Sequence, residues 1–256
     1  MKTKQKLNIC LGILAVLLVC VIAYAPMRAN AATLKNITAG QSFALKHEEQ
    51  EVYKLVIDTD AVVKFAWSND ERNYSYIGLF TDKACKDRIC SCAPSTKSGN
   101  KVWALKKGTY FVQAYDGYSF SSYTPTMKLK VTWEDASVIN KNNYCRAKAI
   151  AVNASTNVRV AQTPTQDYTR WYKIKVPKTQ KLTINAPTGT GTLSNLTVLS
   201  TSMTRFNNFT SSGTGSSAKM VSVDKMAADT YFILVSGCGY SYTKNRLGEY
   251  HVFSWQ

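Results

Sequence analysis

Residues 52–57 read Val-Tyr-Lys-Leu-Val-Ile, and residues 171–176 read Trp-Tyr-Lys-Ile-Lys-Val. In the first stretch the apolar residues Tyr53, Leu55 and Ile57 occupy every second position, with Lys54 between them. The second stretch has the same period of two. This alternation is typical of a β-strand with one face on a core and the other in water. Both stretches therefore predict sandwich strands.

The two stretches belong to a longer internal repeat. The matching blocks are Val52–Ile57 with Trp171–Val176, Thr109–Val112 with Thr230–Ile233, Gly117–Ser119 with Gly239–Ser241, and Val131–Trp133 with Phe253–Trp255. The offset between partners stays between 119 and 122 residues, and the order of the blocks is the same. We therefore predict two copies of one module, at residues 32–138 and 139–256.

Strand-like patterns continue through the rest of the chain beyond residue 31. Leu129, Val131 and Trp133 alternate with polar residues, whereas Tyr231–Val235 is apolar on both parities and predicts a central strand covered on both faces. Turn residues separate the runs at 58–60, 98–100, 106–108 and 210–217, and no helical periodicity stands out. We predict an all-β fold of two tandem jelly-roll-like β-sandwich modules, joined by the short polar segment 140–143.

The first 31 residues carry the features of a secretion signal. Lysines at positions 2, 4 and 6 precede the uncharged run Leu7–Tyr24, and Ala29-Asn30-Ala31 is a small-x-small cleavage pattern. We predict that residues 1–31 are a cleaved signal peptide and that the protein is secreted, extracellular or at the cell surface. A retained single-span anchor is the alternative. Cys20 does not indicate a lipoprotein, because Val19 is too bulky for the residue before a lipidated cysteine.

The chain is strongly basic, with a formal net charge of +16 that becomes +12 once the four Lys and Arg of segment 1–31 are removed. Such a surface attracts anionic partners, among them nucleic acid, acidic glycans, wall polymers and lipid headgroups. Many of the lysines stand singly within the alternating runs: Lys54, Lys64, Lys128, Lys130, Lys173, Lys175 and Lys181. This spacing is typical of solvated strand faces. We expect no nucleic-acid partner and, after signal cleavage, no membrane.

Five cysteines follow residue 31: Cys85, Cys90, Cys92, Cys145 and Cys238. An exported chain permits disulfides. We expect one bridge in each module, Cys145 with Cys238 and Cys85 with Cys90 or Cys92, which leaves one thiol over. A zinc site in the first module is the alternative, but zinc needs four sulfur or imidazole ligands and the chain has only His47 and His251. We therefore expect no metal site.

Four stretches of the first module follow a recognisable order: Val52–Leu55, Ile77–Asp82, Leu105–Val112 and a closing strand to Val131. They resemble the "YxF", "LxLyd", "L-x-x-GTYyv" and "Y-x-L-x-V" motifs of the bacterial pre-peptidase C-terminal (PPC) domain. The second half has a similar order, with residues 195–199 in place of "LxLyd" and Asp229 in place of the glycine of "GTY".

The PPC resemblance implies a jelly-roll-like sandwich on secreted bacterial proteins, usually a non-catalytic accessory to a peptidase or surface protein. Relatives attached to collagenases bind collagen and carry calcium through acidic residues near the module start. The acidic cluster of that kind here is Glu48, Glu49, Glu51, Asp70 and Glu71. Charges spaced in this way are more typical of a solvated loop than of converging oxygen ligands. We expect no cofactor, with calcium as the alternative.

Catalytic motifs are missing from the sequence. His47 lies in a charged loop, and His251 shares strand parity with Phe253 and Trp255, which predicts a partly buried strand residue. No GxSxG elbow or glycine-rich phosphate loop is present. A pair of carboxylates distant in sequence remains the enzymatic alternative. We predict a protein that is not an enzyme.

A turn-like motif occurs twice, as Asp116-Gly-Tyr-Ser-Phe120 and Cys238-Gly-Tyr-Ser-Tyr242. Tyrosine joins apolar area to a hydroxyl group, which suits stacking on sugar rings or on extended peptide. We predict that Tyr118 and Tyr240 cap the cores of their own modules. The predicted ligand-binding residues are Tyr115, Phe120, Tyr123 and Tyr242.

These observations favour a secreted non-catalytic binding module that attaches to an extracellular polymer through aromatic turns and basic strand faces. The expected partner is an extracellular polysaccharide, a cell-wall polymer or a fibrous protein. The alternative is a structural or regulatory protein that binds a protein partner through a sheet edge or the hairpin of Cys85 to Cys92.

Overall fold

The computed structural model describes residues 34–45, 51–68, 75–94, 96–115, 127–163, 169–189, 196–212, 219–236 and 247–256. Lys35–Gln256 form one compact unit. The predicted signal peptide, residues 1–31, lies outside the described residues.

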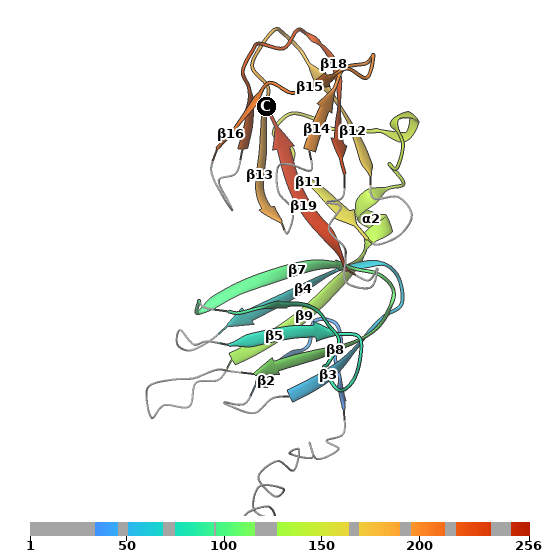
Figure 1. The fold of residues 1–256 in the computed structure, drawn as a ribbon, viewed down its shortest axis with the longest axis vertical. Coiled ribbons are helices and arrows are strands. Elements are labelled where there is room, and N and C mark those ends of the chain that lie inside the picture. Colours follow the sequence, from blue (N-terminus) through green and yellow to red (C-terminus); the bar gives the residue numbers. More distant parts are fainter. Residues whose placement is uncertain are drawn as a thin grey trace, which may run out of the picture. The chain divides into compact units, whose positions relative to one another are not determined.

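Strands make up most of this part of the chain (Figure 1). Up to residue 135 they are β1 (Lys35–Asn36), β2 (Ser42–Leu45), β3 (Glu51–Ile57), β4 (Ala61–Ser68), β5 (Tyr76–Phe80), β6 (Arg88–Cys92), β7 (Ser98–Leu105), β8 (Gly108–Tyr115) and β9 (Met127–Asp135). After residue 149 they are β10 (Ile150–Ala151), β11 (Val158–Gln162), β12 (Arg170–Val176), β13 (Thr183–Gly189), β14 (Leu196–Leu199), β15 (Arg205–Phe206), β16 (Phe209–Ser212), β17 (Lys219–Ser222), β18 (Asp229–Val235) and β19 (Leu247–Trp255). The predicted all-β class is confirmed.

One five-stranded sheet in each half has the same strand order. The first is β1-β3-β8-β5-β6 and the second is β10-β12-β18-β14-β15. In both sheets the first two strands are parallel and every later pair is antiparallel. The register repeats as well, since Leu55 lies opposite Tyr110 and Ile174 lies opposite Tyr231. The sequence repeat therefore coincides with a repeat of topology.

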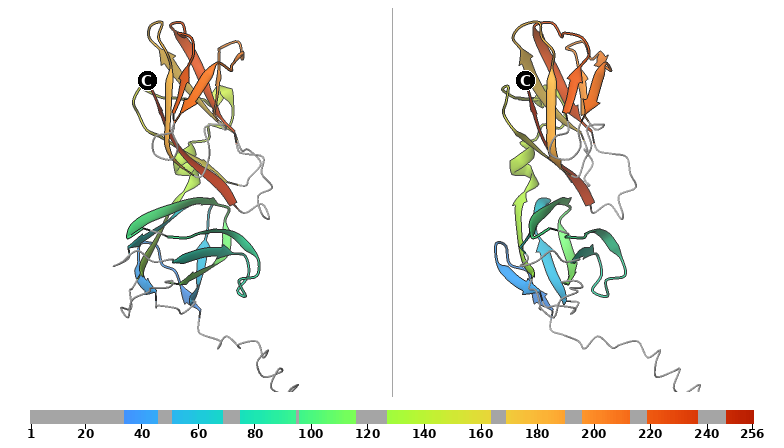
Figure 2. Two further views of the ribbon diagram at one scale, coloured as in Figure 1. Left: turned by 60° about the vertical axis from the view of Figure 1, so that its left-hand side comes forward. Right: turned by 90° about the vertical axis from the view of Figure 1, so that its left-hand side faces the viewer.

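The remaining strands form the second layer of each half. Their order is β2-β9-β4-β7 in the first half and β16-β17-β13-β19 in the second, where β11 also pairs with β19. Leu247 and Gly248 of β19 pair with Leu105 and Ala104 of β7, so hydrogen bonding continues from one set of strands to the other. The two layers of the first half, coloured blue to green, are visible again in the turned views of Figure 2.

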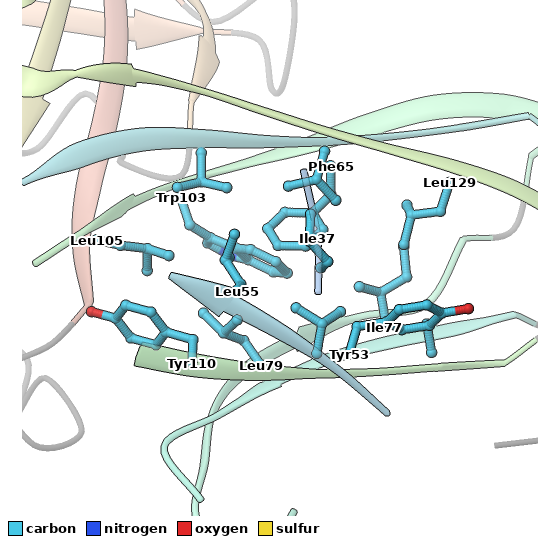
Figure 3. Packing of buried hydrophobic residues seen from close by; sticks show 14 of the residues in the cluster. Ile37, Tyr53, Leu55, Phe65, Ile77, Leu79, Trp103, Leu105, Tyr110 and Leu129 are labelled. Atoms are coloured by element: carbon cyan, nitrogen blue, oxygen red, sulfur yellow. The ribbon is translucent and has the colours of Figure 1, made fainter. Parts of the chain in front are cut away.

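Each half has its own hydrophobic core between its two layers. In the first core Phe65 and Trp103 of one layer point toward Leu79 and Tyr110 of the other (Figure 3). The rings of Phe65 and Trp103 meet edge-on, with centroids 4.9 Å apart. A smaller cluster of Val62, Ala136 and Ala161 is separate from both cores. The apolar parity predicted from the sequence is thus the parity that faces the cores.

The second core has a similar composition. Tyr172 and Phe253 are buried there and meet edge-on at 5.1 Å. β18, which contains the run Tyr231–Val235, is central in its sheet as predicted, and Tyr231, Ile233 and Val235 face this core. Phe232 and Leu234 on the opposite parity are only half-buried, so the predicted double cover is partial.

Two short helices follow β9, and the sequence analysis did not predict them. α2 (Ala136–Asn140) is capped by Asp135, whose carboxylate accepts a hydrogen bond from the Ser137 N–H at 2.7 Å, and η1 (Arg146–Lys148) is a single 3₁₀ turn. A helix of five residues is too short to produce a helical period in the sequence.

Segment 140–143, predicted to be a short polar junction, is held by buried asparagines. The Asn140 side chain donates to the Ala161 carbonyl at 2.6 Å and accepts from the Ala161 N–H at 3.0 Å. Asn143 is fully buried and donates to the Trp171 carbonyl at 3.0 Å. Side-chain amides bind strand backbone through hydrogen bonds, so a segment of polar composition can be held in place without apolar contacts.

One predicted turn, and part of a second, are strand. Residues 98–100 open β7, where they pair with residues 66–68 of β4. Residues 210–212 of the predicted turn 210–217 belong to β16 (Phe209–Ser212) beside β17, and residues 213–217 lie outside the described residues. The cause is the length of the neighbouring strands, which supply backbone partners to residues of low strand propensity. In the described part of the chain, no helix has the length and apolar character needed to cross a membrane.

Candidate functional site

A row of side chains crosses the outer face of the first five-stranded sheet. Lys54 lies opposite Phe111, Phe111 opposite Phe80, and Phe80 opposite Arg88 at a bulge. Their neighbours along the strands belong to the core, and successive side chains of a strand point to opposite faces. This row, named the first outer row, therefore lies on the face away from the core.

The second five-stranded sheet has an equivalent row. Lys173 lies opposite Phe232, Phe232 opposite Leu199, and Leu199 opposite Arg205. These four residues form the second outer row, on strands that occupy the same places in the sheet order as those of the first outer row. The order lysine, phenylalanine, apolar residue, arginine is therefore repeated across both sheets.

Burial gives both rows an apolar centre with charged ends. Phe80 and Leu199 are buried, at 4% and 7% exposure, and the two phenylalanines opposite them are half-buried. Arg88, Lys173 and Arg205 are exposed, and Lys54 is half-buried. A ring flanked by cations can contact an apolar surface of a ligand while the lysine and arginine heads bind its polar or anionic groups.

In the second half two further residues extend the row. The Arg146 guanidinium carbon lies 6.0 Å from the centroid of the Phe232 ring, within the range of a cation–π contact. Arg146 also donates to the Thr201 carbonyl at 3.4 Å. The Trp171 ring meets Phe232 edge-on with centroids 6.2 Å apart. Phe232 of the second outer row therefore has a second aromatic ring, that of Trp171, and the guanidinium of Arg146 beside it.

In the first half the rings lie differently. Gly78 stands between Tyr76 and Phe80 on β5, and a Cβ at Gly78 would come within 2.7 Å of ring carbons of both. The two rings therefore close over the glycine and cover the sheet beside the first outer row. At the equivalent position of the second half, β14 has Thr197, two residues before Leu199, in place of the glycine.

The two halves also differ in charge. Residues 32–138 hold 14 Lys and Arg against 12 Asp and Glu, a net +2, whereas residues 139–256 hold 14 against 4, a net +10. Two of the acids of the first half, Asp82 and Asp87, lie in the turn before Arg88. Asp82 accepts hydrogen bonds from the N–H groups of Asp87 and Lys86, at 2.6 and 3.0 Å, and these bonds lower the pKa of its carboxyl. Carboxylates thus lie close in sequence to the arginine end of the first outer row.

The predicted aromatic turn is largely outside this description. Tyr115 is the last residue of β8 and pairs with Tyr76 of β5. Phe120, Tyr123 and Tyr242, with Tyr118 and Tyr240, lie outside the described residues. Both turns follow the central strands β8 and β18 that carry Phe111 and Phe232, and their role stays a prediction.

The predicted disulfides need correction in the first half. Cys85, Cys90 and Cys92 are free thiols, so the Cys85–Cys90 bridge is not formed. Cys90 and Cys92 pack on the first core from β6, while Cys85 has a left-handed backbone conformation in the preceding turn, with a φ of 53°. Burial raises the pKa of the Cys85 and Cys92 thiols to about 11 and that of Cys90 further. Cys145 is also free, and Cys238 lies outside the described residues.

The remaining candidates for chemistry have structural contacts. His251 is buried as predicted, and its Nε2 lies 3.0 Å from both the Gln162 and the Glu249 side chains. Of the acidic cluster only Glu51 is described, and it accepts hydrogen bonds from Tyr53 and from Lys35, the latter at 3.0 Å. His47 lies outside the described residues, among which no three His, Cys, Asp or Glu residues group as metal ligands do.

The sequence analysis did not predict the outer rows, although two of the four residues of each row stand in repeated sequence blocks. Lys54 and Lys173 stand in the repeated strands that open the sequence analysis, and Phe111 and Phe232 follow the repeated tyrosines. All four alternate with core residues and therefore lie on the face of their strands that points away from the core. Their partners on β5 and β6, or β14 and β15, depend on strand order, which the linear sequence does not contain.

Comparison with known proteins gives one family match. Residues 168–237 match the model of the bacterial pre-peptidase C-terminal domain. This segment contains the four residues of the second outer row and Asp229, the departure from the family's glycine. The match covers only part of the second half, and a second copy of this domain in the first half stays a prediction. No curated protein matches the chain.

Solved structures give more distant similarities. The pre-peptidase C-terminal domain of collagenase from Bacillus anthracis is 13% identical, with a TM-score of 0.33, over 39% of this chain and 94% of that one. The PBSX exported protein XepA is 11% identical, with a TM-score of 0.27, over 86% of both chains. The CUB1-EGF-CUB2 region of human MASP-1/3 is 7% identical, with a TM-score of 0.27, over 82% of this chain and 99% of that one.

Proposed function

We propose that this chain is an exported, non-catalytic protein that attaches to an extracellular polymer through the outer rows of its two five-stranded sheets. The observation that carries this proposal is the repetition of lysine, phenylalanine, apolar residue and arginine at equivalent positions of both sheets. The PPC match at residues 168–237 supports an accessory module of the same kind. We further propose module boundaries at 32–138 and 139–256 and cleavage of residues 1–31.

The location of the rows suits a polymer better than a small molecule. They lie on sheet faces, where a long chain can continue past the row on either side. Two similar rows on one protein can bind two segments of one polymer, and linked weak sites gain strongly in overall affinity. The turns with Tyr115, Phe120, Tyr123 and Tyr242 follow the same central strands, and we propose that they extend the contact.

Retention on insoluble matrices tests this function. The exported chain is mixed with cell wall, insoluble polysaccharide and collagen at low and high salt, and the bound fraction is measured. We expect retention that survives high salt, because ring contacts are not screened as surface charges are. A double variant, Phe111→Ala with Phe232→Ala, should lose it.

Two controls sharpen the result. Val138→Ala with Val223→Ala removes apolar area at residues that are 61% and 48% exposed elsewhere, and this variant should bind as the wild type does. A variant with Tyr115, Phe120 and Tyr242 changed to alanine tests the turns. Loss only in the turn variant would move the site from the rows to the turns. No retention on any matrix would overturn the proposal and favour a protein partner bound at a sheet edge.

A further inference from the structure

We infer that the second outer row, together with Arg146, is a binding site for an acidic polysaccharide, a chain of sugar rings that carry carboxylate groups. This inference rests on the proposed function and names its ligand. It assigns the acidic ligand to the second half alone.

Cations are spaced along the row as a chain of repeating anions requires. Lys173 and Arg205 are three strands apart, or about 14 Å at the strand spacing of a sheet. Arg146 lies between them, above Phe232. Lys175 adds a fourth cation on the same face, opposite Thr230. A polymer that crosses the strands would meet positive charge at both ends of the row and at its centre.

These cations have no acidic partners among the described residues. Lys173, Lys175 and Arg205 are exposed and take part in no ion pair there. Arg146 contacts the Phe232 ring and one carbonyl, which leaves most of its N–H groups for a ligand. Four uncompensated positive charges on one sheet face repel one another, so an anionic ligand would relieve the repulsion.

Acids are also absent from the outward parity of this sheet. Along the described β10, β12, β14, β15 and β18, the only acid is Asp229, the first residue of β18, on the parity of Tyr231, which faces the core. Glu249, on another strand, contacts His251 at 3.0 Å. In the first outer row, by contrast, Arg88 follows directly after Asp87, and Asp82 is two residues after Phe80. Charge complementarity therefore distinguishes the two rows.

Aromatic rings make sugar the favoured backbone of this ligand. Trp171 and Phe232 present apolar ring surface beside the cations, and the C–H faces of sugar rings stack on such surface. A polyanion without rings would use the cations alone. Dependence on Phe232 is therefore the feature that separates an acidic polysaccharide from a simple polyanion.

Binding of three soluble polymers tests the inference. Titration calorimetry of the exported chain compares polygalacturonate, whose sugars carry carboxylates, with neutral dextran and with inorganic polyphosphate. The variant Arg146→Gln, Lys173→Gln, Arg205→Gln should lower affinity for polygalacturonate about tenfold or more, which corresponds to about 1.4 kcal/mol or more of binding free energy. Phe232→Ala should lower it as well.

The control variant Lys64→Gln, Lys128→Gln, Lys130→Gln removes the same charge from exposed lysines on β4 and β9 of the first half. It should keep polygalacturonate affinity within about twofold, since distant surface charges are screened. Equal losses in both triple variants would mean general attraction to a basic surface and would overturn the inference. Binding of polyphosphate that equals binding of polygalacturonate and ignores Phe232→Ala would overturn it too.

The outcome is separable from that of the proposed function. Retention on a neutral matrix that needs Phe111 and Phe232, without binding of polygalacturonate, would keep the function and remove the acidic ligand. No binding to any matrix or soluble polymer would remove both. Circular dichroism and thermal unfolding of every variant exclude a loss through misfolding.

Discussion

In the first half of the chain the Tyr110 hydroxyl donates a hydrogen bond to the Lys106 carbonyl, and in the second half Tyr231 donates to the Ala227 carbonyl at 3.0 Å. Each tyrosine lies on the central strand of its sheet and reaches back four residues, to the turn that precedes that strand. The inner faces of the halves thus agree down to single hydrogen bonds. Their outer faces agree only in the row itself.

The difference between the halves shows which positions packing constrains. Inner residues touch the opposite layer, so a change of size there leaves a cavity or causes a clash. Outer positions are free of that requirement, and there Gly78 with its covering rings in one half corresponds to Thr197 in the other. The two halves also differ in formal net charge, which is +2 for residues 32–138 and +10 for residues 139–256.

The largest effect is expected from truncation of equivalent core residues. Leu55→Ala and Ile174→Ala should each lower the free energy of unfolding by about 2–5 kcal/mol, since both side chains are at most 1% exposed. Hydrogen exchange in β3 and β12, measured for both variants, shows whether each loss stays in its own half. Val56→Ala, at a residue 41% exposed, is the control. Equal loss of protection in both strands would mean that the halves unfold as one unit.

A glycine in the second half should be nearly as sensitive. A Cβ at Gly248 would overlap the backbone oxygen of Gln162 and lie 2.9 Å from the Thr163 Cα, and backbone atoms of a paired strand cannot move aside. Gly248→Ala should therefore cost up to about 3 kcal/mol. At Gly99 the obstacle is the Trp67 side chain, so Gly99→Ala should cost less. Urea unfolding compares the two, and a greater cost at Gly99 would contradict this argument.

The tyrosine hydrogen bonds test whether the halves are equivalent in energy. Tyr110→Phe and Tyr231→Phe each remove one hydrogen bond from a buried or nearly buried ring and should each cost about 1 kcal/mol. Tyr144→Phe, at a residue 40% exposed, should change stability by less than about 0.5 kcal/mol. A loss of stability in only one of the two variants would show that the two hydrogen bonds, although similar in geometry, contribute differently to the free energy of unfolding.

Much of the strand pattern could be predicted from the sequence, because packing against a core requires an apolar residue at every second position of a strand. The parity of Tyr53, Leu55 and Ile57 is the parity that faces the core, and the repeat offset places the second copy of the strand correctly. The sequence does not contain strand order, so the pairing of Phe111 with Phe80 could not be foreseen. The burial of Asn140 and Asn143 depends on backbone groups of β11 and β12 that composition does not indicate.

A smaller effect concerns Asp135, which caps α2 after the first half. Hydrogen bonds from Ser137 lower the pKa of its carboxyl in the folded state. Its stabilising contribution is therefore present above the unfolded-state pKa, about 3.9, and is lost as the pH falls through the lower folded-state pKa. Asp135→Ala should cost about 0.5 kcal/mol at pH 7, and the difference from wild type should shrink at pH 2. Denaturant unfolding at both pH values measures it; a difference that grows in acid would contradict the cap.

The last prediction concerns the reactivity of the thiols on β6, which distinguish the β5–β6 hairpin of the first half from the β14–β15 hairpin of the second half. Cys90 and Cys92 lie on β6, whereas β15, in the corresponding place of the second sheet, has Arg205 and Phe206. The thiolate is the reactive form, and with a pKa of about 11 only about one Cys92 in a thousand is ionised at pH 8. Iodoacetamide should therefore label Cys92 slowly in the folded protein, and Cys90 more slowly still because its burial raises its pKa further.

Labelling after unfolding without a reductant completes this test, because it shows whether slow labelling is caused by burial of a free thiol or by a disulfide. Free thiols become exposed and ionise normally, so mass spectrometry should find Cys85, Cys90 and Cys92 all labelled in denaturant. A disulfide would survive denaturant and leave two of them unlabelled. Protection that persists after unfolding would restore the bridge expected from the sequence, whereas protection lost on unfolding attributes the low reactivity to the core of the first half.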